Sequence, residues 1–293
     1  METDKMRIAV TGATGQLGSD VVIELKKRGH EVFGLGSADM DISDAASVGA
    51  VLEKISPDAV IHCAAWTAVD AAEDVENREK VFAVNSVGTE NIAKVCRALD
   101  CRMLYISTDY VFSGEGERPW QPDCKDFAPL NVYGESKLRG EQAVSAILDK
   151  FFIVRIAWVF GLNGKNFVKT MLKVGKTHDT VRVVNDQIGT PTYTPDLAVL
   201  LADMIVTDRY GFYHATNEGG YISWYDFTKE IYRLAGLDTD VIPVTTAEYG
   251  LSKAKRPFNS RLDKSKLAEA GFSPLPHWQD ALARFLEKYK EIS

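Results

Sequence analysis

The sequence has few cysteines, and they lack the spacing of a metal site. Its four cysteines, Cys63, Cys96, Cys101 and Cys124, form no C-x-x-C pair, and none stands at zinc-ligand distance from a histidine. We therefore expect no bound metal. The pattern suits free thiols in the reducing cytoplasm.

The sequence also lacks a long hydrophobic run. No stretch is long enough to span a bilayer as a helix, and the polar residues before Ile8 do not form a signal-peptide pattern. Acidic residues outnumber basic ones, 41 to 34, which gives a formal net charge of −7. This balance disfavours nucleic acid or an anionic membrane as the main partner. A small anionic ligand is still compatible, because a local cradle of N–H groups can bind phosphate.

Short apolar runs are plentiful in the first half of the 293 residues. They are almost continuous rather than alternating, which is typical of strands that are covered on both faces. Strands are expected at 6–11, 58–65, 101–107 and 151–157, with a weaker candidate at 31–35. Helical patterns lie between them, so the order predicts an α/β fold with a parallel sheet and right-handed crossovers.

Several helices carry start and stop signals. A helix near 15–29 should stop at Gly29, the next should begin at an N-cap on Ser43, and a long one near 78–99 should be interrupted at Gly88. In the second half, the segments 166–176 and 194–205 look helical and 211–216 looks like a strand. A further helix should run from a Ser223 cap to a stop at Gly236.

Three glycines, Gly12, Gly15 and Gly18, follow the first strand directly and open a helix. The first allows a tight turn, the second lets the backbone approach a pyrophosphate, and the third lets the helix pack on the strand. Backbone N–H groups and the helix dipole would hold the phosphates, with Thr14, Gln16 and Leu17 in the same loop. The pattern predicts a Rossmann-type, doubly wound domain that binds a dinucleotide.

We expect this dinucleotide-binding domain to span residues 1–160, with later segments at about 181–215 returning to it. Residues 216–293, together with about 161–180, should form a smaller C-terminal substrate-binding lobe. An acidic residue that selects NAD usually ends the second strand. Here "GLGSADMDI" has no carboxylate directly after Leu35 and no arginine for a 2′-phosphate, so the sequence leaves NADH and NADPH both open.

Tyr133 and Lys137 stand four residues apart in "YGESK" and would share one helix face. Tyrosine normally titrates near pH ~10, and a nearby ammonium would lower that pKa. The lysine could also hydrogen-bond the ribose of a nicotinamide cofactor. Behind a glycine loop, the pair predicts a proton donor and the cation that tunes it. Ser107 and Thr108, at a strand end, are both candidates to polarise a substrate carbonyl.

The glycine spacing and the Y-x-x-x-K pair resemble the extended branch of the short-chain dehydrogenase/reductase superfamily. Six further blocks resemble the dTDP-4-dehydrorhamnose reductase family: "CAAWTAVDAAE", "STDYVFSGEG", "PLNVYGESKLRGE", "RIAWVFG", "NDQIGTPT" and "RPFNSRLDKSKL". The resemblance runs from about Arg7 to the C-terminus. It implies an NADPH- or NADH-dependent reduction of the C4 ketone of dTDP-4-dehydro-6-deoxy-L-mannose to dTDP-L-rhamnose.

The resemblance also implies roles for particular residues. Tyr133 would protonate the C4 oxygen, Lys137 would orient the nicotinamide ribose, and Thr108 rather than Ser107 would hydrogen-bond the carbonyl. Cofactor contacts beyond the glycine loop are expected from Asp41, Ile42, Ala64, Ala65 and Thr67. Substrate contacts are expected from Val69, Asp109, Tyr110, Trp158, Gln187 and Arg256, the last because a guanidinium suits a pyrophosphate. A homodimer is a further expectation from the family.

Three other activities are considered. A sugar-nucleotide 4,6-dehydratase would carry an Asp-Glu pair after Thr108, but here Asp109 is followed by Tyr110, so dehydration is disfavoured. A sugar-nucleotide 4-epimerase would use the same Tyr-Lys pair and stays open. So does a non-catalytic NADP-binding regulatory subunit, like that of methionine adenosyltransferase.

Overall fold

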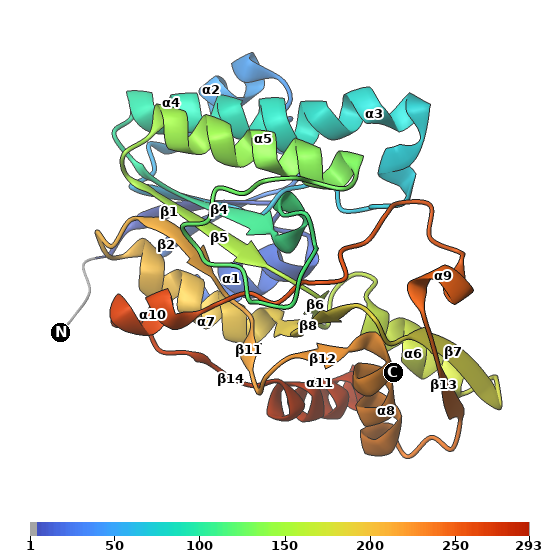
Figure 1. Ribbon diagram of the computed structural model, residues 1–293. Coiled ribbons are helices and arrows are strands. Elements are labelled where there is room, and N and C mark those ends of the chain that lie inside the picture. The colour runs from blue at the N-terminus through green and yellow to red at the C-terminus, as the bar shows by residue number, and fades with distance from the viewer. Residues whose placement is uncertain (1–4, 293) are drawn as a thin grey trace.

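The computed structural model describes residues 5–292 and is built around a six-stranded parallel sheet (Figure 1). The strands, in spatial order, are β2 (Glu31–Leu35), β1 (Arg7–Thr11), β3 (Ala59–His62), β4 (Arg102–Thr108), β5 (Phe151–Ile156) and β10 (Gly211–His214). All five neighbouring pairs are parallel. The five strands expected in the first half are therefore confirmed, including the weaker one at 31–35.

Helices cover both faces of this sheet. One face carries α1 (Gln16–Lys27) and α7 (Thr194–Ile205), and the other carries α2 (Ala45–Ile55), α4 (Gly88–Ala98) and α5 (Val132–Ile147). Strand β1 shows why: Ile8 and Val10 pack toward α1 and α7, whereas Ala9 packs toward α2 and α4. Alternate side chains of one strand thus enter two cores, which confirms the doubly wound α/β prediction.

Helix α8 (Trp224–Ala235) begins and ends where its sequence signals place it. The Ser223 hydroxyl accepts a hydrogen bond from the Asp226 N–H at 3.0 Å, and the Asp226 carboxylate accepts one from the Ser223 N–H at 3.0 Å. Gly236 then takes the left-handed conformation, with φ +67°, at the C-cap.

The expected Ser43 cap is wrong by one residue. The Asp44 carboxylate caps α2 by accepting a hydrogen bond from the Ala46 N–H at 3.0 Å. The Ser43 hydroxyl instead donates to Asp41 at 2.7 Å. Because a carboxylate competes for the same hydroxyl, Ser43 belongs to the preceding turn.

The long helix near Gly88 is widened rather than broken. A helix α3 (Val75–Phe82) continues through a π-helical turn, η2 (Ala83–Val87), into α4, and Gly88 itself is helical with φ −60°. Asn85 lies in the widened turn, where its side chain accepts a hydrogen bond from the Trp66 N–H at 2.8 Å and donates one to the Ser136 hydroxyl at 2.9 Å. The irregular turn therefore ties α5 to the loop after β3.

A smaller layer packs below the sheet in the view of Figure 1. Its helices are α6 (Phe167–Gly175), α8, α9 (Thr246–Tyr249) and α11 (Trp278–Ile292). Its strand pairs are β7 (Thr180–Val184) with β13 (Asp240–Val244), β6 (Val159–Phe160) with β9 (Thr192–Tyr193), β8 (Ile188–Gly189) with β12 (Ile222–Ser223), and β11 (Asn217–Glu218) with β14 (Leu275–His277). Because β7 pairs with β13, the segment that returns to the main sheet begins at α7 rather than near residue 181.

The remaining elements are short. They are the 3₁₀ turns η1 (Ala71–Glu73) and η3 (Asp109–Val111), and helix α10 (Ser265–Glu269), which contacts β10. Strands β2 and β3 flank β1 on opposite sides, so the strand order reverses there. In an open α/β sheet, the crevice outside the carboxyl ends at such a point is where ligands bind. In residues 5–292, no helix has both the length and the apolar character needed to cross a bilayer.

Candidate active site

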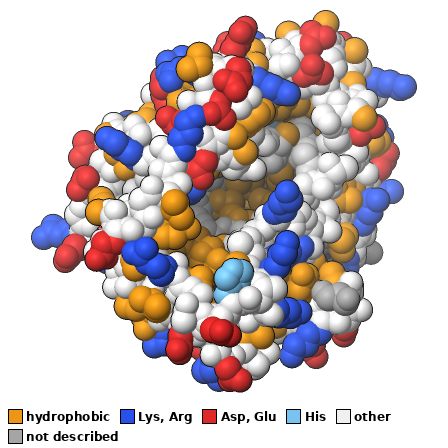
Figure 2. Space-filling model, turned by 90° about the vertical axis from the view of Figure 1, so that its right-hand side faces the viewer, with side chains coloured by type: hydrophobic (Ala, Val, Ile, Leu, Met, Phe, Trp, Pro, Cys, Tyr) orange, Lys and Arg blue, Asp and Glu red, His pale blue; other side chains and the backbone are white. Residues whose placement is uncertain are grey.

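A cleft of about 860 Å³ opens at the carboxyl ends of β1, β3, β4 and β5, within the size range of cofactor and small-molecule sites. Figure 2 looks onto this side of the molecule and shows a hollow with an apolar floor and cationic side chains near its rim. The expected residues that line the cleft are Gly12, Thr14, Gly15, Gln16, Leu17, Asp41, Ile42, Ala64, Ala65, Thr67, Val69, Thr108, Asp109, Tyr110, Tyr133, Lys137 and Trp158. The structure thus brings together most of the residues expected in the site.

The glycine loop has the close contacts that its three glycines predict. Gly12 has φ +65°, and a Cβ atom there would lie 2.7 Å from the Ala64 nitrogen, so the loops after β1 and β3 touch. A Cβ atom at Gly18 would lie 2.2 Å from the Gly12 oxygen, so Gly18 lies behind the cleft lining and lets α1 pack on the loop. Gly15, the N-cap of α1, has no side chain that could accept a hydrogen bond from the first turn. The N–H groups of the first turn are therefore left for another acceptor, which fits a dinucleotide pyrophosphate.

Next to Gly36, which lines the far end of the cleft after β2, stands a carboxylate that the sequence pattern did not reveal, although Asp39 itself lies outside the lining. The Asp39 carboxylate accepts a hydrogen bond from the Gly36 N–H at 2.8 Å. The same oxygen lies 3.5 Å from the position of a Cβ atom at residue 36, the first residue after the strand. Asp39 thus supplies negative charge where a strand-end acidic residue would stand. No lysine or arginine occurs between Gly36 and Ser43.

Helix α5 carries the tyrosine and the lysine into the cleft. Its N-cap, Asn131, accepts a hydrogen bond from the Gly134 N–H at 2.8 Å and donates from its side-chain amide to the Lys255 carbonyl at 2.8 Å. A Cβ atom at Gly134 would lie 2.3 Å from the Tyr110 oxygen, so only glycine lets this turn press against η3. The Tyr133 ring then meets the Tyr110 ring edge-on, with centroids 5.6 Å apart.

Lys137 is a buried residue of the cleft floor. Its ammonium donates to the Ile106 carbonyl at 2.7 Å and lies 4.0 Å from the centroid of the Tyr105 ring. Burial lowers the pKa of Lys137 to about 7, although the Glu141 carboxylate acts in the opposite direction. Lys137 is therefore placed to exchange a proton close to neutral pH.

The expectation that Lys137 lowers the pKa of Tyr133 is wrong for this structure. Burial raises the pKa of Tyr133 well above its ordinary value, and the negative charge of Asp109 raises it further. The neighbouring Thr108 hydroxyl, not Lys137, is the group that opposes this rise in pKa. The physical reason is that desolvation of the phenolate outweighs the neighbouring dipole. Tyr133 is thus held as a neutral phenol at neutral pH.

Thr108 connects the tyrosine to a buried acid. Its hydroxyl donates to the Asp109 carboxylate at 3.0 Å and accepts from the Tyr110 N–H at 3.3 Å. Burial raises the pKa of Asp109 to about 6. Ser107, the second candidate at this strand end, also lines the cleft, and its buried hydroxyl has no hydrogen-bond partner within residues 5–292.

The segment 253–262 lies beside the cleft and carries Arg256. The Arg256 guanidinium donates to the Asp70 carboxylate at 2.7 Å and to the Tyr110 hydroxyl at 3.2 Å. Arg256 itself lies outside the lining of the cleft, next to Tyr110, which is inside it. Arg256 is therefore separated from the hollow by Tyr110, and its position is fixed by Tyr110 and Asp70 of the larger domain.

Two other expected substrate residues differ in placement. Trp158 lines the cleft and has φ +50°, a strained value for a bulky residue, with its ring stacked on Trp224 at 3.7 Å between centroids. Gln187 is buried outside the lining, where its amide donates to the Thr246 hydroxyl at 3.0 Å. In this structure Gln187 thus supports the smaller layer behind the cleft.

Sequence reasoning missed some cleft residues. Lys80 of α3, Val84 of the widened turn η2 and Lys165, in the loop before α6, all line the cleft. No local pattern marks an exposed lysine on a helix or in a loop, so only the tertiary fold reveals them. Among residues 5–292, no group of three or more His, Cys, Asp or Glu side chains could hold a metal ion.

Comparison with known proteins gives a consistent picture. The family model described as the RmlD substrate binding domain matches residues 6–291. A dTDP-4-dehydrorhamnose reductase of Streptomyces griseus is 43% identical over 94% of this chain and 91% of its own length. The spore coat polysaccharide biosynthesis protein SpsK of Bacillus subtilis is 39% identical over 96% of this chain and 97% of its own.

Solved structures agree. The crystal structure of dTDP-4-dehydrorhamnose reductase from Bacillus anthracis, in complex with NADP, superposes with a TM-score of 0.92. It is 39% identical, and the match covers 97% of this chain and 99% of that one.

Proposed function

The chain belongs to the RmlD substrate-binding-domain family, and from this membership and the geometry of the cleft we propose that it reduces the C4 ketone of dTDP-4-dehydro-6-deoxy-L-mannose to dTDP-L-rhamnose. The cofactor is NADPH or NADH. One observation carries the assignment to this cleft: Tyr133, Lys137 and Thr108 line the same hollow as the glycine loop.

Tyr133 is proposed as the proton donor. When bound, the reduced nicotinamide supplies a hydride to C4, and the carbonyl oxygen then needs a proton. The raised pKa of Tyr133 keeps the phenol protonated at neutral pH, which is the state a donor requires. The Thr108 hydroxyl, which acts to lower that pKa, would stabilise the phenolate that remains. The Asp109 carboxylate accepts a hydrogen bond from the Thr108 hydroxyl, so Thr108 lies between Tyr133 and this acid.

Lys137 is proposed to fix the cofactor. It is anchored to the Ile106 carbonyl on β4, so its ammonium has a defined position. With a pKa of about 7, it is partly charged at neutral pH, and an anion or a set of ribose hydroxyls beside it would favour the charged form. The i, i+4 spacing from Tyr133 puts both groups on one face of α5.

The residues assigned to the sugar and the pyrophosphate remain proposals. Tyr110, Trp158 and Val69 line the cleft and are placed to contact the substrate. Arg256 would bind the substrate pyrophosphate, either while it keeps its ion pair with Asp70 or after that ion pair breaks. Gln187 would act indirectly, by shaping the layer behind the mouth.

A coupled assay tests the proposed function. Purified protein receives dTDP-4-keto-6-deoxyglucose, a 3,5-epimerase and either NADPH or NADH, and both cofactor oxidation and dTDP-L-rhamnose are measured. We expect one cofactor oxidised for each product formed. Sugar interconversion without net cofactor oxidation would indicate a 4-epimerase. Nucleotide binding with no turnover would indicate a regulatory subunit.

We further propose that the protein acts as a homodimer in the cytoplasm. The nucleotide sugar and the reduced cofactor are cytoplasmic metabolites, which supports the location. The family resemblance supports the dimer. Light scattering on a gel-filtration peak should give twice the chain mass of 32.4 kDa, and a mass of one chain would contradict the dimer.

A further inference from the structure

Helix α4 ends in a tight turn that leads straight into β4. Asp100 takes the left-handed conformation with φ +55°, its N–H donates to the Arg97 carbonyl at 3.2 Å, and the Cys101 N–H donates to the Cys96 carbonyl at 3.0 Å. These two backbone bonds around a left-handed residue define a Schellman motif.

The motif brings two particular side chains together. In a Schellman motif the residue after the left-handed position contacts a residue of the last helical turn, and this contact is usually between apolar side chains. Here those two residues are Cys101 and Cys96. Their thiols share a hydrogen bond, both are free, and both are buried in the core between α4 and the sheet. Local backbone geometry therefore builds a dithiol from residues five apart in the chain.

We propose that Cys96 and Cys101 form an oxidation site that hydrogen peroxide converts to a disulfide in a reversible reaction. The Cys101 sulfur attacks the peroxide, the O–O bond breaks, and a sulfenic acid and one water form. The Cys96 sulfur then attacks Cys101, the S–O bond breaks, the S–S bond forms, and a second water leaves. Two electrons pass from the sulfurs to the peroxide, and the two thiol protons end on its oxygens. A dithiol reductant reverses the step.

Hydrogen bonding and access to the hollow at the amino ends of the strands favour Cys101 as the attacking sulfur. The hydrogen bond with Cys96 lowers the pKa of Cys101, whereas burial and, less strongly, the carboxylates of Asp100 and Asp58 oppose this change. The same hydrogen bond, together with burial, raises the pKa of Cys96 well above its ordinary value. Burial raises the pKa of Cys63 to about 12. Since the thiolate is the nucleophile, peroxide should react at Cys101 in preference to Cys63.

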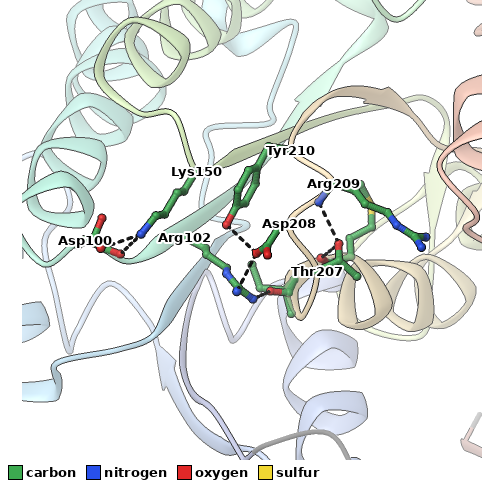
Figure 3. Close-up of polar contacts among 9 residues, drawn as sticks. Asp100, Arg102, Lys150, Thr207, Asp208, Arg209 and Tyr210 are labelled. Carbon is green, nitrogen blue, oxygen red and sulfur yellow. Dashed lines mark hydrogen bonds and ion pairs between the residues drawn. The ribbon is translucent and has the colours of Figure 1, made fainter. Parts of the chain in front are cut away.

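Cys101 also has a route to solvent. It lines a hollow of about 1010 Å³ at the amino ends of the strands, opposite the cleft, and Cys96 does not line it. Figure 3 shows the ion pairs around this hollow: Lys150 with Asp100 at 2.7 Å, and Arg102 with Asp208 at 2.9 Å. They link the residues on either side of Cys101 to the residue before β5 and to the loop before β10.

Peptide mapping tests this proposal directly. The reduced full-length protein is treated with hydrogen peroxide, alkylated and digested with trypsin, which cuts after Lys94, Arg97 and Arg102 and so separates residues 95–97 from residues 98–102. We expect these two peptides to be recovered joined, to separate after reduction, and to account for two of the four thiols. Turnover should be unchanged, because the pair lies at the opposite edge from the cleft.

Three single variants complete the test. Cys96→Ser and Cys101→Ser should each abolish the joined peptides, whereas Cys124→Ser, a half-buried cysteine elsewhere, should leave them unchanged. The peptide map of the unsubstituted protein shows whether the Cys96–Cys101 disulfide forms, even if a variant folds poorly. Recovery of both peptides unlinked and fully alkylated, under conditions that oxidise other thiols, would overturn the proposal. So would Cys101 found only as a sulfinic acid.

Discussion

The Asp39 carboxylate accepts a hydrogen bond from the Gly36 N–H at 2.8 Å and so brings a negative charge to the end of β2. A carboxylate at this place can accept a hydrogen bond from a ribose 2′-hydroxyl and repel a 2′-phosphate. We therefore expect NADH to bind more tightly than NADPH, by about tenfold for like charges a few ångströms apart in a solvated site. The Bacillus anthracis relative was crystallised with NADP, which carries the 2′-phosphate. The cofactor preference of this chain therefore has to be measured on the chain itself.

Titrations of both cofactors by isothermal calorimetry measure this preference. Asp39→Asn keeps an oxygen for the Gly36 N–H and removes the charge, so the Kd for NADPH should fall toward that for NADH. Asp44→Asn is the matched control, since Asp44 only caps α2, and it should leave the ratio unchanged. A wild-type preference for NADPH that Asp39→Asn does not alter would contradict the assignment.

The second prediction concerns Lys137 and pH. Its pKa of about 7 means that the ammonium loses its proton as pH rises through neutrality. If the charged form holds the cofactor, kcat/KM for the reduced cofactor should fall about tenfold per pH unit above that value, because kcat/KM reports groups of the free enzyme. Lys137→Gln should give a low, flat profile. If kcat/KM of Lys137→Gln still falls as pH rises, the fall arises from the titration of another group, and the prediction is contradicted.

The third prediction concerns the buried acid Asp109. Burial raises its pKa from 3.8 to about 6, so the folded protein holds this proton more tightly than the unfolded chain does. This contribution to stability is full below the unfolded pKa and is lost as pH rises from 3.8 to about 6. At pH ~7 the wild type should therefore be less stable than Asp109→Asn by up to about 2–3 kcal/mol, and the two should converge near pH ~4.

Urea unfolding at several pH values measures the difference between Asp109→Asn and the wild type. Asp238→Asn, a substitution of an exposed carboxylate, is the control and should follow the wild type throughout. A variant that is less stable than the wild type at neutral pH would show that the hydrogen bonds made by Asp109 outweigh its desolvation.

Local patterns were enough for much of the fold and part of the site. Gly18 is needed for a close contact with the nearby Gly12, and such a local requirement shows as a spacing in the sequence. The Ser223 cap and the Gly236 stop are equally local. Tyr133 and Lys137 share a helix face by spacing alone, so their joint presence in the cleft was predictable.

Other features depend on residues far apart in the chain. The pairing of β7 with β13 joins segments about sixty residues apart, and no local signal specifies it. The pKa of Tyr133 follows from burial, which the sequence of α5 does not show. Asp39 reaches the strand end only because its turn folds back on Gly36. Ser43 lost its capping role to a competing bond with Asp41, a choice that propensity alone does not resolve.

The central claim, that Tyr133 delivers the proton, is tested most directly by the single-turnover rate of Tyr133→Phe with dTDP-4-dehydrorhamnose and saturating reduced cofactor. Tyr221→Phe, which removes a hydroxyl outside the cleft, is the matched control. We predict a loss of about a hundredfold or more for Tyr133→Phe, with cofactor affinity unchanged and the control at the wild-type rate. A Tyr133→Phe rate close to wild type would contradict the account.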